Sequence, residues 1–434
     1  MSVKYRCLLG AATLAIWAGA PAMGETLDEA VASAFATNPQ LDIQRSETDI
    51  ARENLEQARS GKRPTVNIVG SAGYEYVDMT SPLAFGLGDR PIASAQVQAV
   101  QPLYTGGRVS AGIRQAKAGI NAAKSQFDAA EQDLILQVVS AYVDVRRDRE
   151  AVAIRKNNVE VTGEQVRAAD DRFEVGVVTR TDVSLANARL EGARAALAGA
   201  EAALESSEAN YQFLTSLKPG DLPPPPPIPP LPASLEEAVS VALDGNPDLE
   251  AARHSERAAG EAIEVARAQY RPQINIIGTA GVEQTYGDPD QRNTNVSAVA
   301  QGSIPLLSGG LIKSQVSSAR LRRNQARNQI DLLERQIRAQ VAQAWYGYDA
   351  SLRAIEASRR QVDAAEIAYE GAKEELAVGV RTTLDVLDQE QQLFEARLAL
   401  VQSERDAYVA AYRLLRAAGE LDRPVPMGTA PTSE

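Results

Sequence analysis

The sequence predicts a mainly α-helical protein made of two tandem copies, each with one β-hairpin followed by a pair of long helices. Three observations support this fold class. Segments of the first half return in the second half at a shift of 203 to 208 residues. In each half the hydrophobic period changes once from helical to alternating, which is typical of a short strand pair between helices. Each half also carries a long helical stretch interrupted by a glycine-centred turn.

The internal repeat starts near the N-terminus. Residues 26–31 (TLDEAV) return as residues 234–239 (SLEEAV), and the Asn38-Pro39 pair returns as Asn246-Pro247. Thr and Ser at these starts are good helix N-caps, and the Asn-Pro pairs mark a break before the next helix. The expected organisation is a signal peptide at 1–24, a first copy at 25–221, a linker at 222–232, a second copy at 233–421 and a disordered tail at 422–434.

The first 24 residues are typical of a secretory signal. Lys4 and Arg6 form a basic start, an apolar stretch follows at 7–20, and small residues at 20–24 offer a cleavage site. A membrane anchor is the alternative, but the apolar stretch is short for a span. The only cysteine, Cys7, leaves with the signal. The exported chain is therefore expected to have no disulfide and no thiol chemistry.

Composition excludes two classes of function. The chain has 45 basic and 57 acidic residues and a net charge of −12, which argues against a nucleic-acid partner. The single histidine, His254, lies in a charged helical run where it is expected to be solvated. No clustered metal ligands, phosphate loop or nucleophile–base set is present. We therefore predict that the protein is not an enzyme and has no catalytic residues, cofactor or metal.

Each copy contains one predicted β-hairpin, at about 64–104 and about 272–306, with Gly-, Pro- and Asp-rich loops at 78–91 and 287–292. In the first strand apolar residues alternate with polar ones. One face carries Val66, Ile68, Ala72, Tyr74 and Tyr76, and the other carries Asn67, Ser71 and Glu75. The return strand alternates in the same way, with alanines and Val97 against Ser94, Gln96 and Gln98, and the second copy repeats both patterns.

Strands of ten or more residues are long enough to cross a bilayer when they are tilted. Four strands cannot close a barrel, and an open sheet edge in lipid would leave backbone groups unsatisfied. Two interpretations follow from the hairpins alone. Either several chains share one barrel, with eight strands from two chains or twelve from three, or the hairpins form a small soluble sheet with one wet face.

Long helices, at about 105–218 and 307–418, are predicted to follow the hairpins. The strand–helix junctions are expected at Pro102, Gly106 and Gly107 and at their counterparts Pro305, Gly309 and Gly310. The first helix spans near 70 residues, or on the order of 100 Å. The helix after the glycine turn is about half as long, and we expect the helix after each Asn-Pro pair to stack end to end with it. The Pro-rich linker is interpreted as a stiff spacer, with a docking ligand as the alternative.

The two glycine-centred turns are the candidate functional feature. Residues 174–183 (EVGVVTRTDV) match residues 377–386 (AVGVRTTLDV), which places Gly176 opposite Gly379. In the second copy Asp385 and Asp388 lie three residues apart, on one helix face. These acids can simply favour the helix dipole, with Thr382 and Asp385 forming a capping box. Alternatively, they can serve a charged site at the helix tips.

The order and doubling of these motifs resemble the TolC-type outer-membrane efflux and secretion channels. The likeness spans residues 26 to about 421 and includes QPLYTGG at 101–107, IPLLSGG at 304–310 and VGVRTTLDVLDQEQ at 378–391. The resemblance implies a homotrimer whose four strands per chain form a shared twelve-stranded outer-membrane barrel, in contact with lipid and continuous with a helical periplasmic tunnel. It also implies export without chemistry, from an inner-membrane ABC or RND-type transporter through a periplasmic adaptor.

The resemblance also assigns roles at the helix tips. Asp385 and Asp388 would form a ring of six carboxylates that attracts cations, and crowding would raise some of their pKa values. Arg381, Asp182 and Thr181 match gate positions, and a hydrogen bond from Arg381 to Asp182 is our hypothesis for the latch. The tyrosine that such channels carry shortly before the second turn is missing; Leu376 stands near there.

The wording of these motifs, and the lack of a lipoprotein cysteine, favour the type I secretion branch of the family. The alternative is a periplasmic adaptor or helical coiled-coil scaffold of an export complex, which would also be exported and rich in helices. Such a protein would not need two amphipathic β-hairpins.

Overall fold

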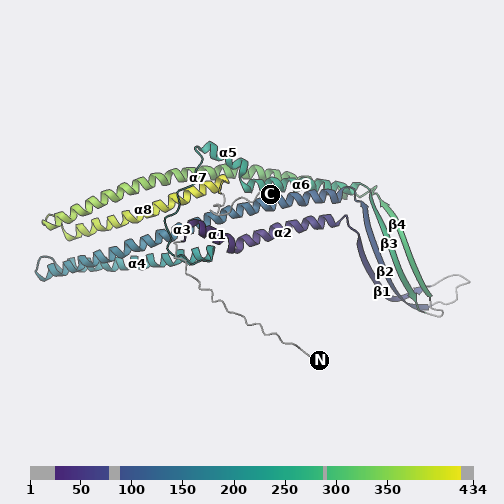
Figure 1. Ribbon diagram of the computed structural model, residues 1–434, viewed down its shortest axis with the longest axis horizontal. Coiled ribbons are helices and arrows are strands. Elements are labelled where there is room, and N and C mark those ends of the chain that lie inside the picture. The colour runs from purple at the N-terminus through teal and green to yellow at the C-terminus, as the bar shows by residue number, and fades with distance from the viewer. Residues whose placement is uncertain (1–24, 78–87, 287–290, 422–434) are drawn as a thin grey trace, which may run out of the picture.

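A computed structural model describes residues 25–77, 88–286 and 291–421. It is an elongated molecule with helices along most of its length and a four-stranded antiparallel sheet at one end (Figure 1). The predicted mixture of long helical pairs and two β-hairpins is confirmed. The predicted signal peptide and C-terminal tail lie outside the described residues. Within the described ranges, no helix has an apolar stretch of the length that a membrane span requires.

The two halves contain the same elements in the same order. The first half consists of α1 (Leu27–Thr37), α2 (Pro39–Ser60), β1 (Thr65–Val77), β2 (Gly88–Tyr104), α3 (Arg108–Glu174) and α4 (Arg180–Thr215). The second half consists of α5 (Leu235–Gly245), α6 (Pro247–Arg267) with a 3₁₀ turn (Ala268–Tyr270), β3 (Gln273–Thr285), β4 (Gln291–Ser303), α7 (Leu311–Ala377) and α8 (Thr383–Ala418). Both α3 and α7 have 67 residues, and both α4 and α8 have 36. At 1.5 Å per residue the longer helices measure about 100 Å.

The sheet is a single layer with strand order β1-β2-β3-β4. The strands have 13, 17, 13 and 13 residues. The predicted loops are partly strand, because β2 already begins at Gly88 and β4 at Gln291. Pro91 is therefore a strand residue that pairs with Tyr74. The rest of the predicted loops, 78–87 and 287–290, lies outside the described residues.

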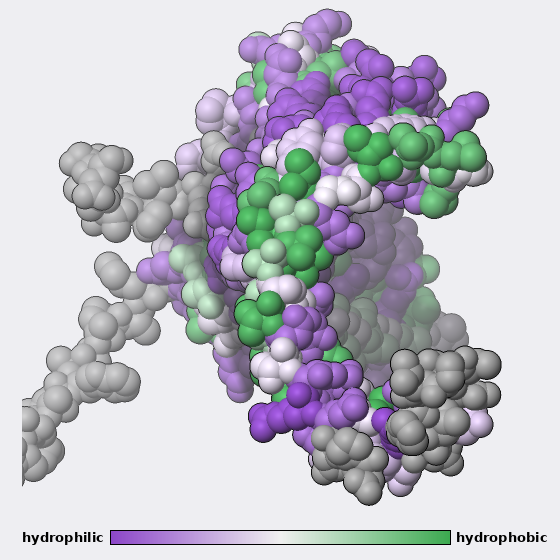
Figure 2. Space-filling model, turned by 90° about the vertical axis from the view of Figure 1, so that its right-hand side faces the viewer, coloured by the Kyte–Doolittle hydropathy of each residue, from purple (hydrophilic) through white to green (hydrophobic). Residues whose placement is uncertain are grey.

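One face of the sheet is apolar, and in the part of the chain that the structure describes its large side chains are exposed. The strand register aligns Ile68, Val97, Ala280 and Val296 in one row across all four strands. The outer members of this row, Ile68 and Val296, are 77% and 78% exposed. Figure 2, which looks at this end of the molecule, shows hydrophobic side chains gathered at the surface. Large exposed apolar areas of this kind mark contact with a membrane or another protein.

The opposite face of the sheet is mainly polar, apart from a row with Val100, Ile277 and Val299. Ser71 and Ser94 share a hydrogen bond of 2.8 Å between their hydroxyls, and Thr279 and Ser297 share one of 2.6 Å. The alternation read from the sequence therefore describes both faces correctly. It arises because successive residues of a strand point to opposite sides.

The short helices that follow the Asn-Pro pairs stack on the ends of the shorter long helices, as expected (Figure 1). Asn38 is the N-cap of α2, and its Nδ2 donates to the backbone oxygen of Leu214, near the end of α4, over 3.2 Å. Asn246 caps α6 and donates to Ala417 near the end of α8, also over 3.2 Å. Each asparagine is almost fully buried. One side chain thus caps a new helix and satisfies a carbonyl of the helix that ends there.

The main core lies at mid-length, where α1, α3, α4 and the linker meet. Tyr142 and Tyr211 are fully buried there. The Tyr142 hydroxyl donates to the backbone oxygen of Pro223 over 2.8 Å. On the other side, the Tyr408 hydroxyl of α8 donates to Pro226 over 3.0 Å. The Pro-rich linker is therefore packed against helices of both halves, which fits the spacer interpretation.

Candidate functional site at the helix tips

The end of the molecule opposite the sheet is formed by the two glycine-centred turns. Gly176 and Gly379 have φ values of +76° and +77°, in the left-handed region that favours glycine. In both turns the residue after glycine donates its backbone N–H to the third-last residue of the helix: Val177 to Arg172 and Val380 to Glu375, each over 2.9 Å. This is the Schellman arrangement, which ends a helix and reverses the chain in a few residues.

A capping box starts the next helix in each copy. Thr382 Oγ1 accepts from the backbone N–H of Asp385, while the Asp385 carboxylate accepts from the Thr382 N–H over 2.9 Å. Thr179 and Asp182 form the same pair in the first copy. Hydrogen bonds from the side chain and backbone of Thr382 lower the pKa of Asp385, and those from Thr179 lower that of Asp182. Within one chain, the pKa of Asp385 therefore moves opposite to the increase expected from crowding.

The second acid of the pair has a different partner. Asp388 accepts a hydrogen bond of 2.6 Å from Arg189 of α4, and both side chains are partly exposed. A second link joins the same two halves, because Arg172 of α3 donates to the Thr383 hydroxyl over 3.2 Å. Asp385 and Asp388 thus lie at the tip as predicted, but one serves as a capping residue and the other as an anchor between helices.

The predicted latch does not form within the chain. Arg381 pairs with Glu375, in the last turn of α7, and not with Asp182. Asp182 is already satisfied by its capping box, and Glu375 is a nearer acid because the turn folds Arg381 back over its own helix. Thr181 is an exposed residue in the first turn of α4, where the capping role belongs to Thr179. Polar links between the halves do exist, but Arg189 and Arg172 supply them.

A cleft of about 640 Å³ separates the two tips. Asp182 and Arg381 both line it, from opposite turns, and so does Leu376 at the position near which a tyrosine was expected. Asp182 and Arg381 therefore face one open space without a direct contact between them, and Thr181 does not line it.

Sequence reasoning missed Glu390, which lies two residues beyond Asp388. Its side chain is only 3% exposed, and Oε1 has no hydrogen-bond partner in the described part of the chain. Burial raises its pKa to about 7. The signal was present in the sequence, because Glu390 falls at helical spacing between Leu387 and Leu393 on the buried side of α8.

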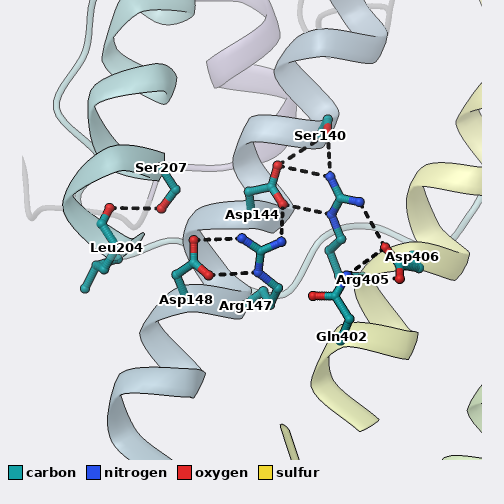
Figure 3. Close-up of polar contacts among 9 residues, drawn as sticks. All are labelled: Ser140, Asp144, Arg147, Asp148, Leu204, Ser207, Gln402, Arg405 and Asp406. Atoms are coloured by element: carbon teal, nitrogen blue, oxygen red, sulfur yellow. Dashed lines mark hydrogen bonds and ion pairs between the residues drawn. The ribbon is translucent and has the colours of Figure 1, made fainter. Parts of the chain in front are cut away.

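A network of charges ties the two halves together at mid-length (Figure 3). Arg405 of α8 reaches α3, where Nε donates to Asp144 over 2.8 Å and Nη2 donates to Ser140 over 2.9 Å. Arg147 points at the same acid and also makes two bonds of 2.8 Å to the nearly buried Asp148. Because these groups are mostly buried and mutually paired, the network is a firm joint, beyond which the helix pairs extend to their tips.

The strand–helix junctions are built around the predicted glycines. Gly106, Gly107, Gly309 and Gly310 all have positive φ, between +59° and +88°. A side chain at Gly106 would lie 2.5 Å from the Ala268 oxygen. Among the described residues, nothing lies within 4 Å of the corresponding point at Gly309.

The prolines of the two junctions differ in place. Pro102 is inside β2, at an irregularity in its pairing with β3. Pro305 follows the end of β4.

Among the described residues, no group of three or more His, Cys, Asp or Glu side chains is placed to hold a metal ion.

Comparison with known proteins identifies the family. The sequence profile described as "Outer membrane efflux protein" matches residues 30–215 and 238–420, which together make up most of the chain. The chain belongs to the outer membrane efflux protein family. The two matched segments coincide with the two halves of the fold.

Relatives in this family include efflux and secretion proteins. The chain is 32% identical over 404 residues to the outer membrane efflux protein BepC of Brucella suis, covering 93% of this chain and 87% of BepC. It is 27% identical over 407 residues to the alkaline protease secretion protein AprF of Pseudomonas aeruginosa, covering 90% and 83%. The fold matches the CmeC outer membrane channel of Campylobacter jejuni with a TM-score of 0.78, at 18% identity over 91% of this chain and 85% of that one.

Proposed function

We propose that this protein is a subunit of an outer-membrane channel that exports substrates from an inner-membrane transporter across the periplasm and outer membrane of a Gram-negative bacterium. The observation that carries this proposal is the uncovered sheet, apolar on one face and polar on the other, joined directly to helices about 100 Å long. The sheet suits a barrel wall, and the helices suit a tunnel that holds most of the mass in the periplasm. The protein performs no chemistry in this role.

The partner that completes the sheet is a second copy of the chain. In the described residues, the outer edges of β1 and β4 have no neighbouring strand. In a membrane such edges must be paired, because unsatisfied backbone groups cost several kcal/mol each in lipid. Three copies joined edge to edge give twelve strands, which agrees with the homotrimer implied by the family resemblance.

The internal repeat suggests how neighbouring copies meet. Within the chain, Arg271 of the second half donates to the Gly106 oxygen of the first half over 3.1 Å. The counterparts of these residues are Arg63 and Gly309, at shifts of 208 and 203. Arg63 pairs with Glu56 just as Arg271 pairs with Glu264, but it is more exposed and is not bound to Gly309. We place Arg63 of one copy against Gly309 of the next.

At the tips, three copies would bring six carboxylates from Asp385 and Asp388 to the narrow end of the tunnel. Such a ring attracts cations and repels anions. The gate would be controlled by contacts around Arg381, Asp182 and Thr181, in a trimer in which these residues also face neighbouring copies. The glycine turns at Gly176 and Gly379 fix where each helix pair reverses.

The cargo and the other partners are proposed from the relatives. The secretion role in the name of AprF favours protein export by a type I system, whereas the name of BepC favours efflux. We propose a periplasmic adaptor as the partner of the helical part, with an ABC or RND-type transporter beneath it. We further propose that 1–24 is removed as a signal peptide and that 222–232 only spaces the two copies.

The test is expression of the full chain, followed by membrane fractionation and heat dissociation of the trimer. The wild type should fractionate with the outer membrane as a trimer. Gly106→Ala should lower its dissociation temperature, because the new side chain meets backbone 2.5 Å away. Gly309→Ala should lower it by a similar amount if a neighbouring copy fills the open space there.

Positive φ alone costs an alanine only about 1 kcal/mol. If Gly309→Ala destabilises the trimer by no more than this cost of positive φ, and so much less than Gly106→Ala does, the result would contradict the proposed contact between copies. Recovery of the mature chain as a soluble protein without detergent would instead support the periplasmic adaptor.

A further inference from the structure

Glu390 occupies a position that the rest of α8 reserves for apolar side chains. The buried residues around it are Val386, Leu387, Leu393 and Phe394. Glu390 itself is only 3% exposed to solvent. Its Oε1 has no hydrogen-bond partner in the described part of the chain. A buried carboxyl group without a partner is costly unless it is neutral. Its presence at the tip, beside the candidate pore acids, calls for a function.

The surroundings of Glu390 come from the other half of the chain. A cavity of about 20 Å³ is lined by Glu390, by Asn158 and Thr162 of α3, and by Arg189 of α4. The Thr162 hydroxyl donates to Asn158 Oδ1 over 3.1 Å, which joins these two side chains. Arg189 is the only cation in this lining. Glu390 therefore lies at the contact between α8 and the α3–α4 pair, within the same small group of side chains as Arg189.

Other titratable groups surround the same site. On α8, Asp388 holds Arg189 at 2.6 Å. On α7, burial raises the pKa of Tyr369, and the negative charges of Glu390 and, on α3, Glu164 raise it further. Arg189 thus provides the positive charge for two carboxylates, of which Asp388 holds it and Glu390 does not.

We propose that Glu390 is a positioning residue whose protonation decides which carboxylate Arg189 binds. In its neutral form Glu390 stays among the apolar side chains, α8 packs on α3 and α4, and Arg189 remains on Asp388. When Glu390 loses its proton, the buried charge draws Arg189 away from Asp388. Asp388 then becomes a free carboxylate at the tip, and the contact between the halves loosens. The effect of this protonation switch on export rests on the proposed channel function. The switch itself does not depend on that function.

The physical reason is the cost of an unpaired buried charge. An ionised carboxylate in such a site is strongly destabilising unless a cation reaches it or water enters. Arg189 is suited to the exchange because its side chain is partly exposed and long, and its guanidinium offers five donors. Because burial raises the pKa of Glu390 to about 7, the exchange falls within the range of pH that cells experience.

Hydrogen exchange measured by mass spectrometry on the purified full-chain oligomer tests the switch. Backbone protection, corrected for the intrinsic effect of pH, is compared at pH 6 and pH 8 in the segments 155–165, 183–193 and 383–393. The wild type should lose about tenfold or more in protection at the higher pH, since one pKa unit corresponds to a tenfold change. Glu390→Gln keeps the shape without the titration and should remain protected. Glu395→Gln, on the exposed side of the same helix, is the matched control and should behave as the wild type.

Two further variants sharpen the test. Asp388→Asn releases Arg189 to Glu390 and should move the midpoint of the transition to lower pH. Arg189→Met removes the cation that stabilises ionised Glu390 and should move it higher. A wild-type transition that persists unchanged in Glu390→Gln, or midpoints that do not move in the other two variants, would overturn the proposal.

The protection measurement does not need a working channel. If the protein forms no channel but shows the Glu390-dependent transition, the proposed function fails and the switch stands. If the channel conducts but the transition is absent, the switch fails and the proposed function stands.

Discussion

At the scale of single residues, the tip is governed by local satisfaction of polar groups. Asp182 and Asp385 each form a capping box. Arg381 forms an ion pair with Glu375, and Asp388 forms one with Arg189. Only Glu390 combines deep burial with an unpartnered carboxyl oxygen in this described region. Its titration therefore has the clearest effect on stability.

The sign of that effect follows from the pKa values. The ordinary pKa of a glutamate is 4.5, and the pKa of Glu390 in the folded protein is about 7. Between these values the unfolded chain has lost the proton and the folded chain has kept it, so folded-state stability falls as pH rises through this window. The native state of the wild type should lose roughly 1–3 kcal/mol relative to Glu390→Gln between pH 4.5 and pH 7.5. Chemical denaturation in detergent at both values measures this, and a difference between the two proteins that does not change with pH would contradict it.

At the scale of elements, the repeat makes paired predictions possible. Asn38 and Asn246 hold equivalent helix junctions with equal donor–acceptor distances of 3.2 Å. Asn246→Ala should cost about 1–2 kcal/mol, because it removes an N-cap and leaves the Ala417 carbonyl without its donor. Asn38→Ala should cost a similar amount. Thermal unfolding followed by circular dichroism checks both, with the exposed Asn187→Ala as control; a cost for one variant alone would show that the two junctions are not equivalent.

Periodicity predicted the elements well because helices and strands are determined by neighbouring residues. The alternation of Val66 to Tyr76 specified the apolar sheet face, and the glycine pairs specified the junctions. The partners of charged residues were harder to predict. Arg381 could reach Asp182 or Glu375, and only the three-dimensional turn favours Glu375. Glu390 was missed because its helical spacing between Leu387 and Leu393 indicates burial only once the buried face of that helix has been assigned.

At the scale of the whole molecule, a single chain leaves surfaces that we expect other copies to cover. In the part of the chain that the structure describes, the sheet has two open edges, its apolar face is exposed, and one of the two glycine junctions lacks the neighbour that the other has. The mid-length network of Arg405 joins the two halves firmly, and the caps at Asn38 and Asn246 join helices within each half. The tips beyond are held by few polar links, of which Arg189–Asp388 is the shortest described. Among the described residues, polar contacts between the halves are therefore sparser at the tips than at mid-length.

The most direct test of the account is single-channel conductance of the purified, crosslinking-verified trimer in a planar bilayer, for the wild type and for Asp385→Ala/Asp388→Ala. We expect a small cation-selective current in the wild type and loss of selectivity in the double variant, because the variant removes the acidic groups from the narrow end of the proposed tunnel. Equal cation selectivity in both proteins would contradict the assignment of the pore acids. Failure of the wild type to insert into the bilayer would contradict the channel itself.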